Sequence, residues 1–122
     1  MSIVSTKNFH PDTDKKLRCT CGCGQYHVKQ HALDKLQQVR KVLNRPLTVI
    51  SGYRCERHPE ERRKPVPGQH SNGVAFDVAI VGGVQRYEVI KAGLQCGATG
   101  IGVAKTFVHL DWRDDAPMAW EY

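Results

Sequence analysis

The chain has 122 residues, of which 40% are hydrophobic and 25% are charged, as in a typical globular protein. This length suits one domain over residues 1–122, whose core needs no disulfides for its stability. No stretch approaches the roughly 20 consecutive apolar residues that cross a bilayer, so we expect no membrane span.

The balance of charge points to an anionic partner. Eighteen basic and 12 acidic residues give a formal net charge of +6, which attracts nucleic acid, a lipid surface or an acidic cell-wall polymer. The densest basic cluster, ERRK at 61–64, lies in a proline-rich stretch and matches no nucleic-acid-binding motif. We therefore expect a solvated loop there and no nucleic-acid partner, with binding through this loop as the alternative.

The N-terminal residues 1–16 lack a basic start followed by an apolar run, so we expect no signal peptide. A protein without one is expected to stay in the cytosol until something releases it to the cell wall. We also expect a monomer.

Five cysteines are an odd number, and without export a disulfide framework is not expected. Cys19, Cys21 and Cys23 follow a C-x-C-x-C spacing, whereas zinc knuckles usually use C-x-x-C pairs. We expect reduced, partly buried thiols, with a second, structural metal as the alternative.

The first half of the chain predicts one helix and one strand after an irregular segment at 1–26. Apolar residues recur at three- and four-residue steps over 27–43, which indicates an amphipathic helix that Asn44 and Pro46 would end. A short strand is expected at 47–51. The connection at 52–73 contains three prolines and three glycines, and a loop that long in a compact domain is usually functional.

The second half predicts strands at 74–80, 99–104 and 106–112, with an amphipathic helix at 84–96. The apolar face of this helix is expected to carry Val84, Tyr87, Ile90 and Leu94. No helix separates the last two strands, which argues against a parallel α/β sheet. We therefore predict an α+β fold, with helices packed on a small, mostly antiparallel sheet.

Two histidines and an aspartate stand at strand positions that suit a metal site. His70 and Asp77 flank the entry to the strand at 74–80, and His109 lies on the last strand. Two histidines with one carboxylate are a common zinc set that leaves a fourth position for water. Zinc with an open position lowers the pKa of water to about 7 and polarises a carbonyl. The alternative is a surface histidine and an aspartate that only caps a turn.

Three further residues belong to this hypothesis. Side chains alternate along a strand, so Asp111 shares a face with His109 and could act as general base or orient a ligand histidine. Arg54 follows a strand and could bind an anionic group of a substrate or stabilise an oxyanion, the alternative being a surface salt bridge. Gly73 would let the backbone turn between loop and strand.

Three motifs, SGYR at 51–54, H-x-x-G-x-A-x-D at 70–77 and VHLDW at 108–112, together resemble a known family. It comprises zinc D-Ala-D-Ala carboxypeptidases and L-alanyl-D-glutamate endopeptidases, phage endolysins among them, and the resemblance covers about 9–120. It implies the fold of the hedgehog signalling domain and a zinc ion held by His70, Asp77 and His109. It also implies hydrolysis of a peptide bond in the peptidoglycan stem, with Arg54 near the scissile carbonyl and a carboxylate that takes a proton from the attacking water.

The chain departs from the family pattern at two positions. Gly68 stands where the family usually has serine, two residues before the first zinc histidine. Thr106 stands where many members carry a glutamate or aspartate as general base, so we expect Asp111 to replace it, with Asp114 as the weaker candidate. If neither reaches the water, the alternative is a non-catalytic zinc module that binds the cell wall or forms part of a phage particle. The sequence leaves open which stem-peptide bond is cut.

Overall fold

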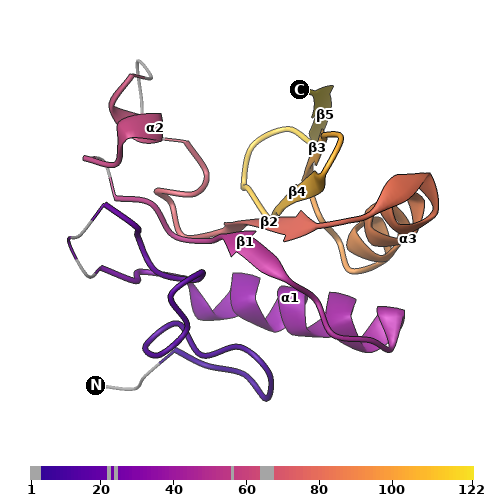
Figure 1. Ribbon diagram of the computed structural model, residues 1–122, viewed down its shortest axis with the longest axis horizontal. Coiled ribbons are helices and arrows are strands. Elements are labelled where there is room, and N and C mark those ends of the chain that lie inside the picture. The colour runs from indigo at the N-terminus through magenta and orange to yellow at the C-terminus, as the bar shows by residue number, and fades with distance from the viewer. Residues whose placement is uncertain (1–3, 22, 24, 56, 64–67) are drawn as a thin grey trace.

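A computed structural model describes residues 4–21, 23, 25–55, 57–63 and 68–122. Its strands form one open five-stranded sheet in the order β1-β2-β4-β3-β5, with helices packed beside it (Figure 1). Along the chain the elements are α1 (Gln30–Leu43), β1 (Val49–Ser51), α2 (Pro59–Arg62), β2 (Ala75–Ala79), α3 (Gly82–Gln95), β3 (Gly100–Val103), β4 (Phe107–Asp111) and β5 (Met118–Glu121).

The sheet is mixed, and the prediction of a mostly antiparallel sheet is wrong. Strands β1, β2, β4 and β3 pair antiparallel, but β5 pairs parallel with β3. After β4 the chain reverses and pairs with the far edge of β3. Because β3 is itself antiparallel to β4, the returning strand runs parallel to β3. Strand β5 was not predicted from the sequence. The α+β class is confirmed, and the likeness to the hedgehog domain stays a prediction.

The first helix and the long connection follow local signals in the sequence. Helix α1 begins at Gln30 rather than His27, and it ends at Asn44, whose left-handed backbone (φ 54°) caps the last turn. The connection at 52–73 contains the short helix α2, which has Pro59 in its first turn and the side chain of His58 as its N-cap. Of the basic cluster at 61–64, Lys64 lies outside the described residues.

The apolar face predicted for the second helix is wrong except at Ile90, which is half-buried and packs against the core. In α3 the side chains of Val84, Tyr87 and Leu94 are mostly exposed, and the helix instead buries Val89, Ala92 and Gly93. A Cβ placed on Gly93 would lie 2.6 Å from Leu110 Cδ2 of β4. The helix approaches the sheet closely through small residues, whose hydrophobic signal in the sequence is weak. Within the described residues, no helix is long and apolar enough to cross a membrane.

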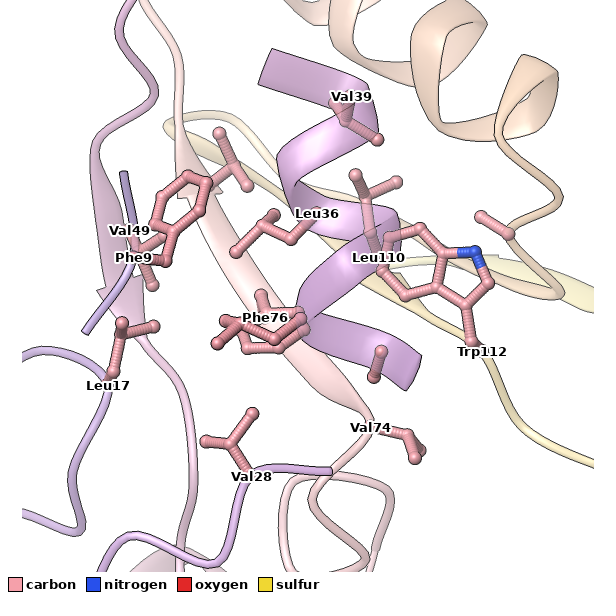
Figure 2. Packing of buried hydrophobic residues seen from close by; sticks show 14 of the residues in the cluster. Phe9, Leu17, Val28, Leu36, Val39, Val49, Val74, Phe76, Leu110 and Trp112 are labelled. Carbon is pink, nitrogen blue, oxygen red and sulfur yellow. The ribbon is translucent and has the colours of Figure 1, made fainter. Parts of the chain in front are cut away.

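The two faces of the sheet are different in kind because side chains alternate along β2 and β4. Phe76 and Leu110 point into an apolar core shared with Leu36 and Val39 of α1 (Figure 2). Burial of each such side chain contributes about 1.5–3 kcal/mol to stability. The alternate positions place Asp77 of β2, together with His109 and Asp111 of β4, on the opposite face.

Candidate metal centre and active site

Two paired strands and one turn bring the predicted metal ligands together. Asp77 lies directly opposite His109 in the β2–β4 ladder. His70 lies in the turn before β2, where Gly73 has φ 76°. A Cβ on Gly73 would lie 2.2 Å from the carbonyl oxygen of His27, so only glycine fits this turn. The structure thus places His70 over the two strand residues.

The three side chains converge on one point. Asp77 Oδ1 lies 3.3 Å from His70 Nε2 and 3.2 Å from His109 Nδ1. All three residues are buried, and one ligand atom from each lies within 4.8 Å of the other two. The two imidazole rings are nearly perpendicular, with centroids 5.1 Å apart. This group could therefore hold a metal ion.

In each histidine, the ring nitrogen that faces away from the centre forms a hydrogen bond, and this leaves the other ring nitrogen available to bind a cation. His70 Nδ1 lies 2.7 Å from the carbonyl oxygen of Gly52, which only accepts, so Nδ1 carries the proton and Nε2 has a free lone pair. In the same way His109 Nε2 lies 2.7 Å from Asp111 Oδ2, which leaves the lone pair on Nδ1. Two lone pairs and the carboxylate of Asp77 then face one another. Such outer hydrogen bonds orient the histidines of metal sites, and this ligand set suits zinc.

The charges of the centre are set by burial and by close contacts. Burial lowers the pKa of His70, which favours the neutral ring. Burial acts to raise the pKa of Asp77, but hydrogen bonds with His109 and His70 outweigh it and hold that pKa below its usual range. For His109 burial lowers the pKa, yet hydrogen bonds with Asp111 and Asp77 raise it overall. A proton and a metal ion compete for the same lone pair of His109, so acid opposes metal binding.

Asp111 lies behind His109 and is fully buried. Besides the contact with His109, its oxygens accept two hydrogen bonds from the Arg113 guanidinium, at 2.8 and 2.6 Å, and one from the Arg113 backbone at 3.2 Å. Burial acts to raise the pKa of Asp111, but the bonds from Arg113 and His109 lower it to about 2. Of the two roles expected for Asp111, this position favours orientation of His109.

Arg54 lies beside the centre and connects it to a buried glutamate. Its Nη2 lies 3.3 Å from Asp77 Oδ2 and its Nη1 lies 3.5 Å from Glu61 Oε2. Glu61 also accepts hydrogen bonds from the Gly68 backbone at 2.8 Å and from Ser71 Oγ at 3.2 Å. Glu61 was not predicted as a site residue, because it belongs to the cluster at 61–64 that was interpreted as a solvated loop.

A cavity of about 620 Å³ opens over the centre. Trp120 and Tyr122, which were not predicted as site residues, line it together with Arg54, and the Trp120 ring lies 4.9 Å from that of His109. Neither Thr106 nor Asp114 is among its described lining residues; both are exposed. The three converging ligands therefore have an open side toward a space that can admit a substrate. The full described lining is Arg54, Glu60, Arg63, Gly68, Gln69, His70, Asp77, Phe107, His109, Arg113, Trp120 and Tyr122.

Comparison with known proteins agrees with this geometry. A family model described as Peptidase M15 matches residues 8–111. This range contains the motifs at 51–54 and 70–77, the motif at 108–112 except for its last residue, and the His70, Asp77 and His109 group. No curated protein matches the chain significantly. The match confirms the resemblance drawn from the three motifs and supports a metallopeptidase. Because it spans well over half of the sequence, the chain belongs to the Peptidase M15 family.

Proposed function

We propose that this protein is a zinc-dependent peptidase that hydrolyses a peptide bond in the stem peptide of peptidoglycan. The observation that carries the proposal is the convergence of His70, Asp77 and His109 beneath an open cavity, in a chain of the Peptidase M15 family. Zinc held by these residues would polarise the scissile carbonyl and lower the pKa of water to about 7.

The protein's own residues prepare the centre for this reaction. Gly52 and Asp111 fix the tautomers of the two histidines, so both ligand nitrogens present lone pairs without rearrangement. Arg54 presents its guanidinium beside Asp77 at the cavity wall. We assign to Arg54 the binding of the developing oxyanion, because an arginine fixed before the reaction stabilises charge without reorganisation.

The proton of the attacking water needs an acceptor. Asp111 was the expected general base, but it is fully buried and its oxygens already accept four hydrogen bonds. Glu60 lines the cavity with a side chain that is 47% exposed, paired with Arg63. We therefore propose Glu60 as the proton acceptor and Asp111 as the residue that positions His109.

The walls of the cavity suit an anionic peptide. Arg54 and Arg63 contribute positive charge, and Phe107, Trp120 and Tyr122 contribute aromatic surface. Stem peptides carry free carboxylates, and the net charge of +6 favours approach to an anionic wall. A role in phage-type lysis is part of the same proposal, supported by the motif resemblance. We propose as well that the protein acts as a monomer and stays in the cytosol before its release.

The decisive experiment is a digest of purified peptidoglycan, with released fragments identified by mass spectrometry. The zinc-loaded protein should release stem fragments, a chelator should stop the release, and added zinc should restore it. The fragment masses would name the bond that is cut. The matched control is His109→Ala, which removes one ligand and should release nothing.

A non-catalytic wall-binding module is the second candidate. It is favoured by Thr106, which replaces the usual carboxylate, and by the full engagement of Asp111. This alternative predicts that the zinc-loaded protein sediments with peptidoglycan but releases no fragment from any stem chemistry. That result would overturn the peptidase proposal.

A further inference from the structure

The irregular segment before α1 is packed against the loop that follows β1. The backbone N–H of Tyr53 donates to the carbonyl oxygen of Leu17 at 3.2 Å. A Cβ on Gly52 would lie 2.9 Å from Leu17 Cα, so the two backbones are in direct contact. This contact brings the cysteines of the N-terminal segment next to Cys55, which is far from them in the sequence.

Four thiols meet at this junction. The Sγ atom of Cys19 lies 3.3 Å from that of Cys21 and 3.5 Å from that of Cys55, and the Cys21 and Cys55 sulfurs are 3.3 Å apart. The Cys23 sulfur completes the group, with all four sulfurs within 4.8 Å of one another. Four sulfurs that each lie about 2.3 Å from one zinc ion are about 3.8 Å apart. The cluster therefore has the size of a tetrahedral thiolate site.

We propose that Cys19, Cys21, Cys23 and Cys55 bind one zinc ion in a closed, structural site. This site goes beyond the proposed peptidase function and is separate from the His70, Asp77 and His109 centre. Four thiolates fill the coordination of zinc, so the ion would have no open position for a substrate. Thiolates in tetrahedral geometry also select zinc over magnesium or calcium.

Backbone donors already point at the sulfurs, as they do around thiolates that carry charge. The N–H of Cys55 lies 3.3 Å from Cys19 Sγ, and the N–H of Gln25 lies 3.4 Å from Cys23 Sγ. Burial acts to raise the pKa of the Cys55 thiol, but hydrogen bonds from Cys21 and Cys19 lower it to about 7. Hydrogen bonds with Cys19 and Cys55 raise the pKa of Cys21 to about 12. A bound divalent cation would favour the thiolate form of its ligands, because a thiol that coordinates a metal is deprotonated.

The site would fix the wall of the active site from outside. Cys55 directly follows Arg54, whose guanidinium contacts Asp77. Zinc bound to Cys55 would join the Arg54 backbone to the N-terminal segment, which contains the other three ligands. Cys21 and Cys23 are exposed, so the metal has a path from solvent.

The test is to count metal in protein purified under reducing conditions and loaded with zinc. Elemental analysis should find two zinc ions per chain in the wild type and one in His70→Ala/His109→Ala. It should also find one in Cys21→Ser/Cys23→Ser, whose substitutions lie at exposed positions, and none when the pairs are combined. Cys96→Ala is the matched control, since this buried cysteine lies outside the cluster, and it should keep two.

Cobalt substitution identifies the ligands directly, and the measurement on wild-type protein remains informative if a variant fails to fold. Wild-type protein and His70→Ala/His109→Ala should both show intense thiolate-to-cobalt charge-transfer absorption, whereas Cys21→Ser/Cys23→Ser should lack it. The proposal is overturned if reduced wild-type protein shows no such absorption. It is equally overturned if the natively purified protein has a mass lower by four hydrogen atoms, which would mean two disulfides. Failure of peptidoglycan hydrolysis would count against the peptidase proposal but not against the thiolate zinc site, because the two sites are separate.

Discussion

Within the described residues, two groups of side chains could hold a metal ion, and they are built in opposite ways. One consists of His70, Asp77 and His109, which are buried, and two of these project from paired strands. The other consists of four cysteines, three from an irregular segment and one from the loop after β1. The first has three ligands and opens to a cavity, whereas the second has four and no place for a substrate. The number of ligands, rather than the presence of a metal, thus separates a catalytic centre from a structural one.

The clusters also differ in what holds them without metal. The β2–β4 ladder fixes Asp77 and His109, and outer hydrogen bonds fix both histidine rings. The thiols depend on a few backbone contacts between two segments without regular structure. We expect metal removal to stop catalysis at the first centre with little change of fold, and to loosen the N-terminal segment at the second.

The largest effect should come from His109→Ala. This change removes one of three ligands, so turnover of peptidoglycan should fall to background and one zinc ion per chain should be lost. The thiolate-bound ion should remain, because His109 takes no part in the second cluster. Mass spectrometry of released fragments and elemental analysis measure the two effects.

His31→Ala is the matched control for that variant, since His31 is an exposed histidine on α1. It should keep both metal ions and full turnover. Chelator-sensitive turnover by His109→Ala would contradict the assignment of the catalytic centre.

The side chain of Arg54 contacts Asp77 of the first cluster, and its backbone directly precedes Cys55 of the second. Arg54→Ala tests whether the side chain acts in catalysis at the first cluster. Loss of a donor to an oxyanion lowers kcat by about 100- to 1,000-fold. Both metal ions should stay bound, because the side chain of Arg54 ligates neither. Steady-state kinetics on a defined stem peptide, with a metal count on the same sample, measures this.

Arg45→Ala removes an arginine that forms a surface ion pair with Glu88. Exposed pairs contribute roughly 0–1 kcal/mol to stability, so this variant should retain wild-type kcat and serves as the control. An Arg54→Ala protein with unchanged kcat would rule out the oxyanion role.

Asp111→Asn should act on the first centre alone. Loss of a partner behind a ligand histidine weakens metal binding by about 10- to 100-fold. If Asp111 only positions His109, saturating zinc should restore turnover, whereas Glu60→Gln should stay slow at any zinc concentration. Zinc titrations followed by activity compare the two variants. A slow Asp111→Asn enzyme at saturating zinc, beside an active Glu60→Gln enzyme, would return the general base to Asp111.

Prediction from sequence succeeded where one local pattern decides the geometry. Alternation along a single strand placed Asp111 beside His109, and their side chains are 2.7 Å apart. It failed where packing between distant segments decides. Helix α3 buries Val89, Ala92 and Gly93 and leaves Val84, Tyr87 and Leu94 exposed, and its close approach to Leu110 requires a glycine at position 93.

The missed site residues have the same explanation. Trp120 belongs to β5, a four-residue strand that exists only because the edge of β3 is free to pair. Glu61 acquires its role when α2 folds back toward Arg54. The cysteine spacing resembles no zinc knuckle because the fourth ligand comes from the loop after β1, and only the three-dimensional structure brings it near.

The smallest effect should come from Gly100→Ala on β3. A Cβ there would lie 2.1 Å from Asp111 Oδ2, so the carboxylate would have to shift and strain its bonds with Arg113 and His109. Overpacking of this kind lowers the free energy of unfolding by about 1–3 kcal/mol, and the displaced carboxylate should weaken zinc binding at the first centre only.

Gly83→Ala is the control: it lies in α3, where the nearest atom to a new Cβ is the Arg86 side chain at 3.9 Å. That change should stabilise the helix by roughly 0.5–1 kcal/mol. Urea unfolding with and without zinc compares both variants. Equal zinc affinity in Gly100→Ala and the wild type would mean that the hydrogen bond from His109 to Asp111 does not control the metal.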